Sequence, residues 1–346
     1  MTLQTTLNTE PTIAAGFAYG LLEFAVSAGG SRDRLLVSSG IAQGVLSDHF
    51  NRIPLSRYIS LMRTAQCECG DPALALHFGA SSRCADLSIV ALIGSACETV
   101  ADALRMLNRY GRISLDVEGV NGNDHFLIDR DRDGVWLIEN RRYHDVYPEL
   151  TEATFARFAV GIRASFGSNA VRAMHVCHDA PAHRAAYEAI IQAPVTFGQA
   201  RTALLLDPKW YDTKLAPAPK YALRVYTAQA DALLRELEAS RSVAGRVDAT
   251  LMEILHTGDV SMDRIARALA MSRPTLYRAL KAEGMTFERV LDGVRHRVAM
   301  THLTQRKATV NEVSSLVGFS DPSAFSRAFK RWTGVSPRAA ASVPAV

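Results

Sequence analysis

A short stretch near the C-terminus carries side chains suited to contact a polyanion. Over residues 322–332 the apolar Phe325, Ala328 and Phe329 recur at helical spacing, which leaves the opposite face polar. That face carries Ser323, Ser326, Arg327 and Lys330. Hydroxyl and guanidinium groups are donors that proteins use on phosphates and base edges. The stretch is predicted to be a helix that fits a major groove; the alternative is an ordinary solvated surface helix.

The residues before this helix predict a second helix and a sharp turn. Asp321 and Pro322 are a typical N-cap and first-turn pair, because proline lacks an N–H that the first turn would leave unbonded. Upstream, an apolar stripe at helical spacing is interrupted by Gly318. The stripe consists of Val310, Val313, Leu316 and Val317. Residues 309–332 are therefore predicted to form a helix-turn-helix.

A second copy of the pattern lies upstream, at residues 261–282. Its predicted outer face carries Arg273, Pro274, Tyr277, Arg278 and Lys281. Residues 287–304 between the copies read as one helix about 27 Å long at about 1.5 Å per residue. Successive major-groove faces of DNA are about 34 Å apart, so one chain could read two half-sites. The repetition favours DNA binding over a solvated surface.

Residues 242–338 resemble the DNA-binding domain of AraC/XylS-type transcriptional regulators, most specifically in VGFSDPSAFSRAFKRWTGVSP. The resemblance implies base-edge roles for Arg273, Pro274, Tyr277, Arg278, Pro322, Ser323, Ser326 and Arg327. It implies phosphate contacts or helix-end caps for Lys281 and Lys330. The prolines lack a side-chain donor, so van der Waals contact or helix placement is expected of them. Tyr277 stands where a smaller polar residue is common, and alanines replace the aromatic-basic ending after Pro337.

Charge is unevenly distributed along the 346 residues. From Arg241 onward 16 Lys and Arg face 9 Asp and Glu, whereas the first 240 residues hold 23 against 26. Only the C-terminal part has the balance of a polyanion-binding domain. No apolar run is long enough to cross a membrane and the N-terminus lacks a secretory signal pattern, so a cytoplasmic protein without membrane contact is expected.

The N-terminal part is predicted to be α+β, with helices first and a small antiparallel sheet after them. The hydrophobic period changes from 3.6 to 2 at about Ile113. Residues 113–117, 124–129 and 134–140 are predicted to form a three-stranded meander. A helix is expected at 148–166, and strands at 171–176, 195–197 and 203–206.

Residues 16–237 resemble the arabinose-binding-type effector domain shared by ornithine-utilisation-type regulators. The resemblance lies in SDHFNRIPLSRYISLM, GDPALALHFG, SACETVADALRMLNRYGRIS and VTFGQARTALLLDPKWYDTKL. It implies effector sensing and self-association, although the word "arabinose" is not evidence for a sugar.

An effector is expected between the inward face of the meander and the helix after it. Aromatic and polar side chains concentrate there, and the candidates are Tyr110, His125, Phe126, Trp136 and Tyr143. Plain packing of a small sheet is the alternative. The five cysteines follow no disulfide or metal spacing and the His175–His183 cluster has poor ligand geometry, so neither metal nor cofactor is expected.

The predicted layout is an effector-binding and dimerisation domain at 11–237, a linker at 238–246 and an all-α DNA-binding domain at 247–340. No motif of a hydrolase, nucleotide-binding enzyme or metalloprotease is present. The interpretation is a regulator that binds promoter DNA, responds to an unknown small molecule, forms a homodimer and, if it is an activator, contacts RNA polymerase. A ligand-independent architectural DNA-binding protein is the alternative.

Overall fold

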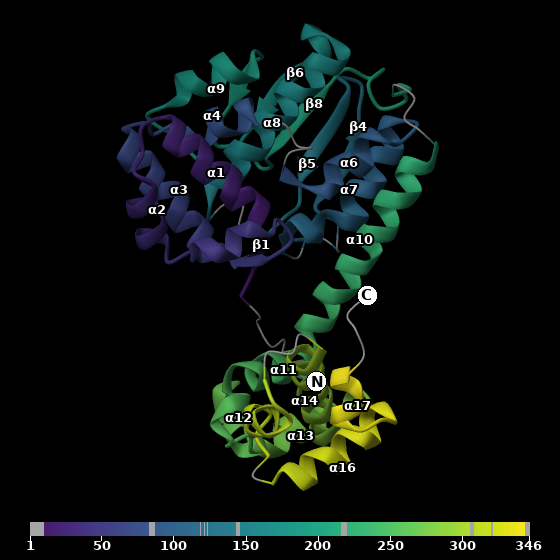
Figure 1. Ribbon diagram of the computed structural model, residues 1–346. Coiled ribbons are helices and arrows are strands. Elements are labelled where there is room, and N and C mark those ends of the chain that lie inside the picture. Colours follow the sequence, from purple (N-terminus) through teal and green to yellow (C-terminus); the bar gives the residue numbers. More distant parts are fainter. Residues whose placement is uncertain are drawn as a thin grey trace. The chain divides into compact units, whose positions relative to one another are not determined.

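The chain divides into two compact units, residues 1–234 and 235–346. The computed structural model describes residues 10–82, 87–117, 119–120, 122, 124–142, 146–215, 220–304, 308–319 and 321–342. Within them no helix is both long and apolar enough to cross a membrane. Figure 1 shows the elements of each unit.

The first unit is α+β, as predicted. Its helices are α1 (Ala15–Ser27), α2 (Arg32–Ser39), α3 (Leu55–Cys69), α4 (Leu74–Ser81), α6 (Ile89–Ser95), α7 (Val100–Ser114), α8 (Pro148–Phe166), α9 (Arg184–Ile191) and the first part of α10 (Lys220–Arg241). Its strands are β1 (Thr12–Ala14), β2 (Arg52–Pro54), β3 (Leu115–Asp116), β4 (Phe126–Arg130), β5 (Val135–Glu139), β6 (Val171–His175), β7 (Val195–Thr196) and β8 (Ala203–Leu206). Short 3-10 turns lie at Gln43–Ser47 and Ser168–Ala170.

The strands form two sheets, so the predicted three-stranded meander is wrong. Residues 113–114, predicted to begin the first strand, are the last residues of α7. Strand β3 pairs with β1, with Leu115 opposite Ile13, in a small sheet of order β2-β1-β3. The larger sheet has the order β4-β5-β8-β6-β7 and is antiparallel except for the β6–β7 pair. Only the β4–β5 hairpin of the meander exists, because the partner of β3 lies about a hundred residues upstream.

Helix α8 packs on one face of the larger sheet. Phe155, Ala156 and Ala159 of α8 are fully buried in one cluster with Met174 of β6 and Leu204 of β8. Pro148 occupies the first turn of α8, where the missing N–H costs nothing. Helices α6 and α7 form a pair whose outer side packs against Ala230 of α10. In α7, the Thr99 side chain caps the first turn by accepting from the Asp102 N–H.

The second unit is all-α and contains both predicted helix-turn-helix motifs. Its helices are α11 (Val243–Ile254), α12 (Met262–Ala268), α13 (Arg273–Ala282), α14 (Phe287–Thr304), α15 (Val310–Leu316), α16 (Pro322–Thr333) and α17 (Pro337–Ser342), with a 3-10 turn at Leu255–Thr257. One core joins them, and its fully buried side chains include Leu276 of α13 and Phe325 and Phe329 of α16. The two motifs therefore share a single hydrophobic core.

The turns of the two motifs have the same hydrogen bonds. After α12, the backbone N–H of Ala270 donates to the Arg267 carbonyl and that of Met271 to the Ala266 carbonyl. After α15, the N–H of Gly318 donates to the Ser315 carbonyl and that of Phe319 to the Ser314 carbonyl. Both Ala270 (φ 54°) and Gly318 (φ 73°) are left-handed, a conformation that costs an L-residue about 1–2 kcal/mol but glycine almost nothing. The first motif therefore carries strain that the second avoids.

We expect Ala270→Gly to stabilise the second unit by about 0.5–1 kcal/mol, because relief of the left-handed strain exceeds the added entropy of the unfolded chain. Gly318→Ala is the matched opposite change and is expected to cost at least about 1 kcal/mol, since its Cβ would also lie 3.2 Å from the Leu255 carbonyl oxygen. Urea titration in a Trp136→Phe, Trp210→Phe background, where Trp332 is the sole tryptophan, measures both changes by fluorescence. Equal effects of the two changes would contradict the assignment of strain.

Candidate ligand cavity and nucleic-acid interface

The first unit contains a cavity of about 400 Å³ along one side of α8. Its lining on α8 follows helical spacing from the first turn to the last: Leu150, Ala153, Thr154, Arg157, Phe158, Gly161, Ile162, Ser165 and Phe166. This stripe lies beside the buried face that contacts the sheet, so α8 serves both the core and the cavity. A volume of this size suits a small organic ligand.

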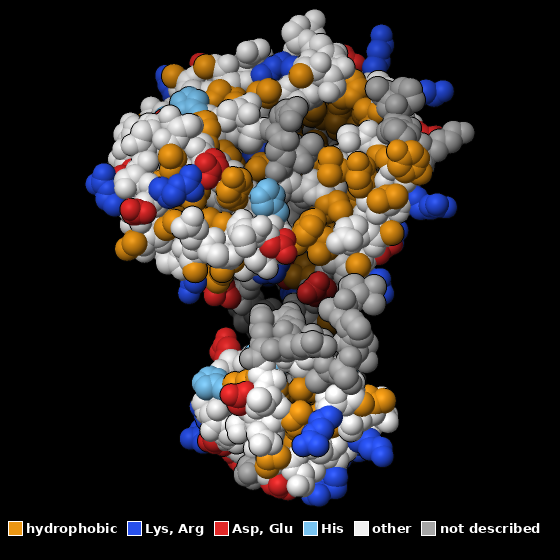
Figure 2. Space-filling view, in the orientation of Figure 1, with side chains coloured by type: hydrophobic (Ala, Val, Ile, Leu, Met, Phe, Trp, Pro, Cys, Tyr) orange, Lys and Arg blue, Asp and Glu red, His pale blue; other side chains and the backbone are white. Residues whose placement is uncertain are grey.

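The facing wall is built mainly by α6 and α7. They contribute Val90, Ala91, Gly94 and Ser95 from α6, and Val100, Ala103, Leu104, Leu107, Gly111 and Ser114 from α7. Phe126 and Leu137 of the sheet form the floor. Ser95, Gly161 and Ser165 are exposed, so the cavity opens to the surface near the ends of α6 and α8. Figure 2 shows a hollow rimmed by hydrophobic side chains in this region.

The structure places the five predicted effector residues in different surroundings. His125 and Phe126 line the cavity. Tyr110 is fully buried and lies on the other side of α7, where its hydroxyl donates to Asp231 of α10 at 2.7 Å. Trp136 does not line the cavity; its indole N–H donates to Asp131 and its ring lies 4.5 Å from that of His175. Tyr143 lies outside the described residues.

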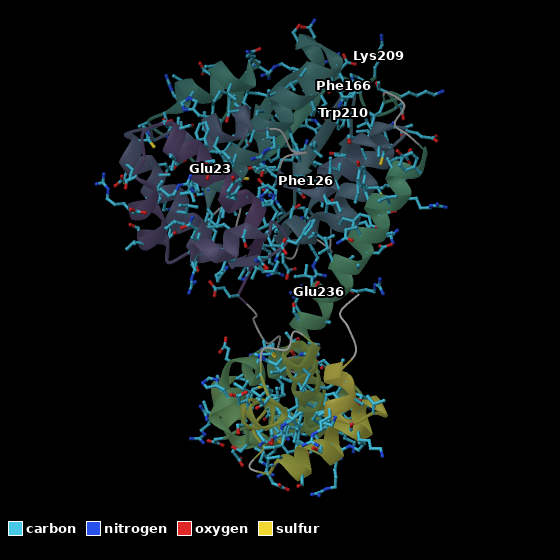
Figure 3. The ribbon with its side chains drawn as sticks, viewed as in Figure 1. Glu23, Phe126, Phe166, Lys209, Trp210 and Glu236 are labelled. Carbon is cyan, nitrogen blue, oxygen red and sulfur yellow. The ribbon has the colours of Figure 1, made fainter. Side chains whose placement is uncertain are left out.

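The helix after the strands lines the cavity as predicted from the sequence, whereas the contributions of α6, α7 and Trp210 were not predicted. Trp210 follows β8 and lies 6.5 Å from Phe166, ring centroid to ring centroid. Figure 3 labels both, together with Phe126. The indole N–H of Trp210 is buried and has no hydrogen-bond partner among the described residues. The apolar stripe on α8 was visible as a period of 3.6, whereas nothing local predicts that Trp210 faces it.

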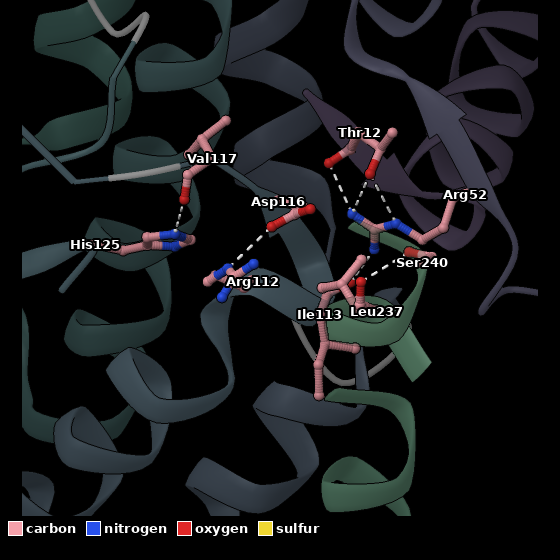
Figure 4. Close-up of polar contacts among 9 residues, drawn as sticks. All are labelled: Thr12, Arg52, Arg112, Ile113, Asp116, Val117, His125, Leu237 and Ser240. Carbon is pink, nitrogen blue, oxygen red and sulfur yellow. Dashed lines mark hydrogen bonds and ion pairs between the residues drawn. The ribbon is translucent and has the colours of Figure 1, made fainter. Parts of the chain in front are cut away.

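Polar contacts close the cavity at the β1 end. Arg52 of β2 donates to the Thr12 carbonyl at 2.7 Å and to the Ile113 carbonyl, which ties the small sheet to the end of α7 (Figure 4). Burial lowers the pKa of Arg52 to about 10, so it remains charged at neutral pH. Arg112 donates to Asp116 at 3.0 Å. This end is held by hydrogen bonds rather than by packing alone.

His125 is a buried neutral histidine. Its Nε2 lies 3.0 Å from the Val117 carbonyl oxygen, and because a carbonyl only accepts, Nε2 carries the proton. Its Nδ1 lies against Gly111, where an added Cβ would be only 2.8 Å away. Burial, helped by the charge of Arg141, lowers the pKa of His125 to about 4.

The predicted nucleic-acid contacts of the second unit lie on two exposed helix faces. On α13, Arg273, Pro274, Tyr277, Arg278 and Lys281 are all exposed, while Leu276 and Leu280 point into the core. The N-cap Ser272 accepts from the Thr275 N–H. Arg273 pairs with Asp263 of α12 at 3.1 Å, and both side chains are more than half exposed. Such a pair is weak, so it leaves Arg273 able to bind another acceptor.

Helix α16 presents the equivalent face. Pro322, Ser323, Arg327 and Lys330 are exposed and Ser326 is half-buried. Asp321 caps the helix by accepting from the N–H groups of Ser323 and Ala324 at 3.0 and 2.9 Å, and these bonds lower the pKa of Asp321. The cap fixes the start of the helix that carries these side chains.

Two polar residues that the sequence did not single out hold these helices in place. Arg295 of α14 donates to the carbonyls of Val317 and Gly318 in the turn before α16, and its guanidinium lies 4.3 Å from the Phe319 ring centroid. Glu283, just after α13, accepts from the N–H groups of Val243 and Ala244 at the start of α11. Helix α14 is therefore part of the second motif and not only a spacer.

Among the described residues no group of three or more His, Cys, Asp or Glu could hold a metal ion. The model of the arabinose-binding domain of AraC transcription regulators, N-terminal, matches residues 29–215, more than half of the chain. A helix-turn-helix domain model matches residues 265–342. Both resemblances predicted from the sequence are thereby confirmed, and the matched families are transcription regulators rather than enzymes.

One curated relative is similar along nearly the whole chain, and others are similar over part of it. The ornithine utilization regulator of Pseudomonas aeruginosa is 26% identical over 340 residues, which cover 95% of this chain and 96% of that protein. The transcriptional activator NphR of a Rhodococcus species is 36% identical over 92 residues, 27% of this chain and 28% of its own. The crystal structure of the regulator CdpR from Pseudomonas aeruginosa is 23% identical, covers 78% of this chain and 86% of that one, and has a TM-score of 0.38.

We expect His125 to make folding sensitive to mild acid. Because its folded-state pKa is about 4 and an unfolded histidine has a pKa of about 6.5, its contribution is complete above pH 6.5 and is lost as the pH falls toward 4. The loss amounts to about 2–4 kcal/mol. Urea titrations of the wild type and His125→Gln between pH 4 and pH 7 give the free energy of unfolding at each pH. The wild type should lose more stability than the variant as the pH falls. Parallel plots of unfolding free energy against pH would contradict the expectation.

Proposed function

Because this chain belongs to the AraC family of transcription regulators, we propose that it is a one-component sensor in which a small molecule bound in the α8 cavity alters promoter binding. The observation that carries the proposal is the 400 Å³ cavity, which lies in the part of the chain matched by the effector-domain model. The same chain carries two exposed basic recognition helices, α13 and α16. An architectural protein would have no use for a ligand-sized cavity in a separate unit.

A physical route from the cavity to the second unit starts at α7. One side of α7 lines the cavity, and the other side binds α10 through Asp231, which accepts from Tyr110 at 2.7 Å and from Arg109 at 3.0 Å. Burial and the Asp231 carboxylate raise the pKa of Tyr110 to about 12, so its hydroxyl remains a donor. Helix α10 then continues past Arg235, where the second unit begins, and ends at Arg241. A ligand that shifts α7 thus acts directly on the connecting helix.

Exposed apolar side chains on α10 support a homodimer. Tyr221 is 68% exposed and Val225 is 56% exposed, so both add apolar surface that water covers in a single chain. Two adjacent exposed apolar residues on a helix suit packing against an equal helix.

Ornithine, the compound in the name of the Pseudomonas relative, does not suit this cavity. Ornithine carries two ammonium groups, and among the described residues no Asp or Glu lines the cavity. Burial of an ammonium group without a counter-charge costs several kcal/mol. We therefore propose a different effector for this chain.

Gly161 offers a way to block the cavity without disturbing the fold. It lines the cavity, and a Cβ added there would meet no atom within 4 Å. We expect Gly161→Leu to obstruct the cavity where it opens to the surface and to weaken the effector-dependent change in operator affinity. The fold should be preserved, because glycine within a helix costs about 1 kcal/mol relative to leucine or alanine.

Gly161→Ala is the matched control, since it makes the same gain in helix stability with little added volume. The assay selects an operator from random duplexes, screens metabolites by thermal shift and then measures operator affinity with each stabilising compound. A Gly161→Leu protein that responds to the compound as strongly as the wild type would contradict the assignment of the cavity.

Arg327→Ala is expected to weaken binding to the selected operator more than to random duplex, by about 1–3 kcal/mol, because we assign it to a base edge. Lys281 is assigned to a phosphate. Lys281→Ala should therefore weaken binding to both DNAs equally and reduce the slope of log affinity against log salt concentration by about one. Fluorescence anisotropy over a salt series measures both. Equal losses on the two DNAs for Arg327→Ala would reassign it to a phosphate.

A further inference from the structure

Most polar side chains that line the enclosed part of the α8 cavity already have partners in the protein. The hydroxyls of Ser88 and Ser114 lie 2.6 Å apart, and His125 donates from Nε2 to the Val117 carbonyl at 3.0 Å. The rest of the wall is largely aliphatic or aromatic, with Leu104, Leu107, Leu137, Phe158, Ile162 and Phe166 among its members. A ligand against this wall must be largely apolar, because a polar group buried there loses its hydrogen bonds to water.

The charged side chains of the lining are bound within the protein as well. Arg141 forms an ion pair with Glu139. Arg157 lies 5.8 and 5.5 Å from the ring centroids of Phe17 and Phe78, and it has other interactions within the protein. Among the described residues no Asp or Glu lines the cavity. An ion of either sign would therefore enter without a free counter-charge, so the lining favours a neutral ligand.

The hydroxyl of Tyr58 differs from these groups. The Tyr58 side chain lines the cavity and is 2% exposed, and its hydroxyl has no hydrogen-bond partner among the described residues. The indole N–H of Trp210 also lacks a partner but is enclosed by protein atoms, whereas the Tyr58 hydroxyl is not so enclosed. A ligand in the cavity can therefore supply the bond that Tyr58 lacks.

Tyr58 lies at the closed end of the cavity, away from the opening at the end of α8. It belongs to one buried cluster with Ile13 of β1 and Leu150 in the first turn of α8. Burial raises the pKa of Tyr58 to about 12, while the charges of Arg157 and Glu149 act on that pKa in opposite directions. The hydroxyl thus keeps its proton at neutral pH, and the two opposite charges give no preference for an ion of one sign beside it.

On the premise of the function proposed above, we infer that the effector is a neutral, largely apolar molecule with an oxygen acceptor, such as a ketone or an ester. The acceptor would enter first and accept from the Tyr58 hydroxyl at the closed end. The apolar body would then extend along α8 toward Phe166 and Trp210. A sugar or another polyol would bury several hydroxyls against side chains that cannot bond them, and is disfavoured.

The test measures binding of defined probes to the full-length protein by thermal shift and calorimetry. The probes are 2-octanone, the hydrocarbon 1-octene, the ions octanoate and octylammonium, and L-arabinose. We expect 2-octanone to bind at least about tenfold more tightly than either ion, because only the ions bury a charge without a free partner. Affinity for 2-alkanones should rise about fourfold per added CH₂ until the chain fills the cavity.

Tyr58→Phe removes the proposed donor and keeps the ring. It should weaken binding of 2-octanone about 3- to 10-fold and change binding of 1-octene by less than about twofold. Without ligand its melting temperature should not fall, because the hydroxyl makes no bond within the protein that the change would break. Gly161→Leu should weaken binding of both compounds, and Gly161→Ala should preserve it.

Other outcomes separate this inference from the proposed function. Octanoate or octylammonium bound as tightly as 2-octanone would overturn the neutral class. Equal loss of 2-octanone and 1-octene in Tyr58→Phe, or a lower melting temperature of that variant without ligand, would overturn the contact with Tyr58. Binding of arabinose alone, weakened by Gly161→Leu, would overturn the ligand class while the sensor function stands. If neutral compounds bind in the cavity and none changes operator affinity, the ligand class stands and the sensor function is overturned.

Discussion

The ligand cavity depends on the buried polar contacts that fix α8 in place. A helix beside an empty space gains apolar contact by moving into it, because an unfilled cavity destabilises a core in proportion to its volume. Three charged residues of α8 oppose that movement. Glu149 accepts from Arg63 of α3 at 2.6 Å. Glu152 lies 2.7 Å from His183 and accepts from the Tyr187 hydroxyl at 3.0 Å. Arg157 donates to the Ser82 hydroxyl at 3.2 Å. Burial raises the pKa of Glu152, so these bonds also satisfy a carboxylate that would otherwise be costly in the core.

Small residues keep the other wall from filling the space. Gly94 and Ala103 meet where α6 and α7 face the cavity, since a Cβ added to Gly94 would touch only that of Ala103, at 3.9 Å. Gly111 leaves room for the His125 ring, and Gly161 faces open space on α8. Larger side chains at Gly94 and Ala103 would occupy part of this space. The cavity is thus a consequence of side-chain size on a rigid frame, and it is mainly apolar because the frame is a hydrophobic core.

The DNA-binding unit relies on a different constraint, a single core shared by two motifs. Leu276 of the first recognition helix and Phe325 of the second belong to one cluster, and Arg295 joins the linking helix to the turn of the second motif. Neither recognition helix can shift independently of this core, which suits the reading of two sites at a fixed separation. The cations remain exposed because the apolar side chains on the opposite faces anchor both helices in the core.

The sequence alone determined the local features of this protein: the helix periods, the N-cap at Asp321, the two helix-turn-helix motifs and the exposed cations on them. These follow from backbone hydrogen bonding and amphipathicity, which act over a few residues. Tertiary structure decided what depends on distant partners. Strand β3 pairs with β1 rather than β4, Tyr110 faces α10, Trp136 faces away from the cavity, and Trp210 lines it. Strand pairing and the choice of face depend on contacts between residues far apart in the chain, and local periodicity carries no information about them.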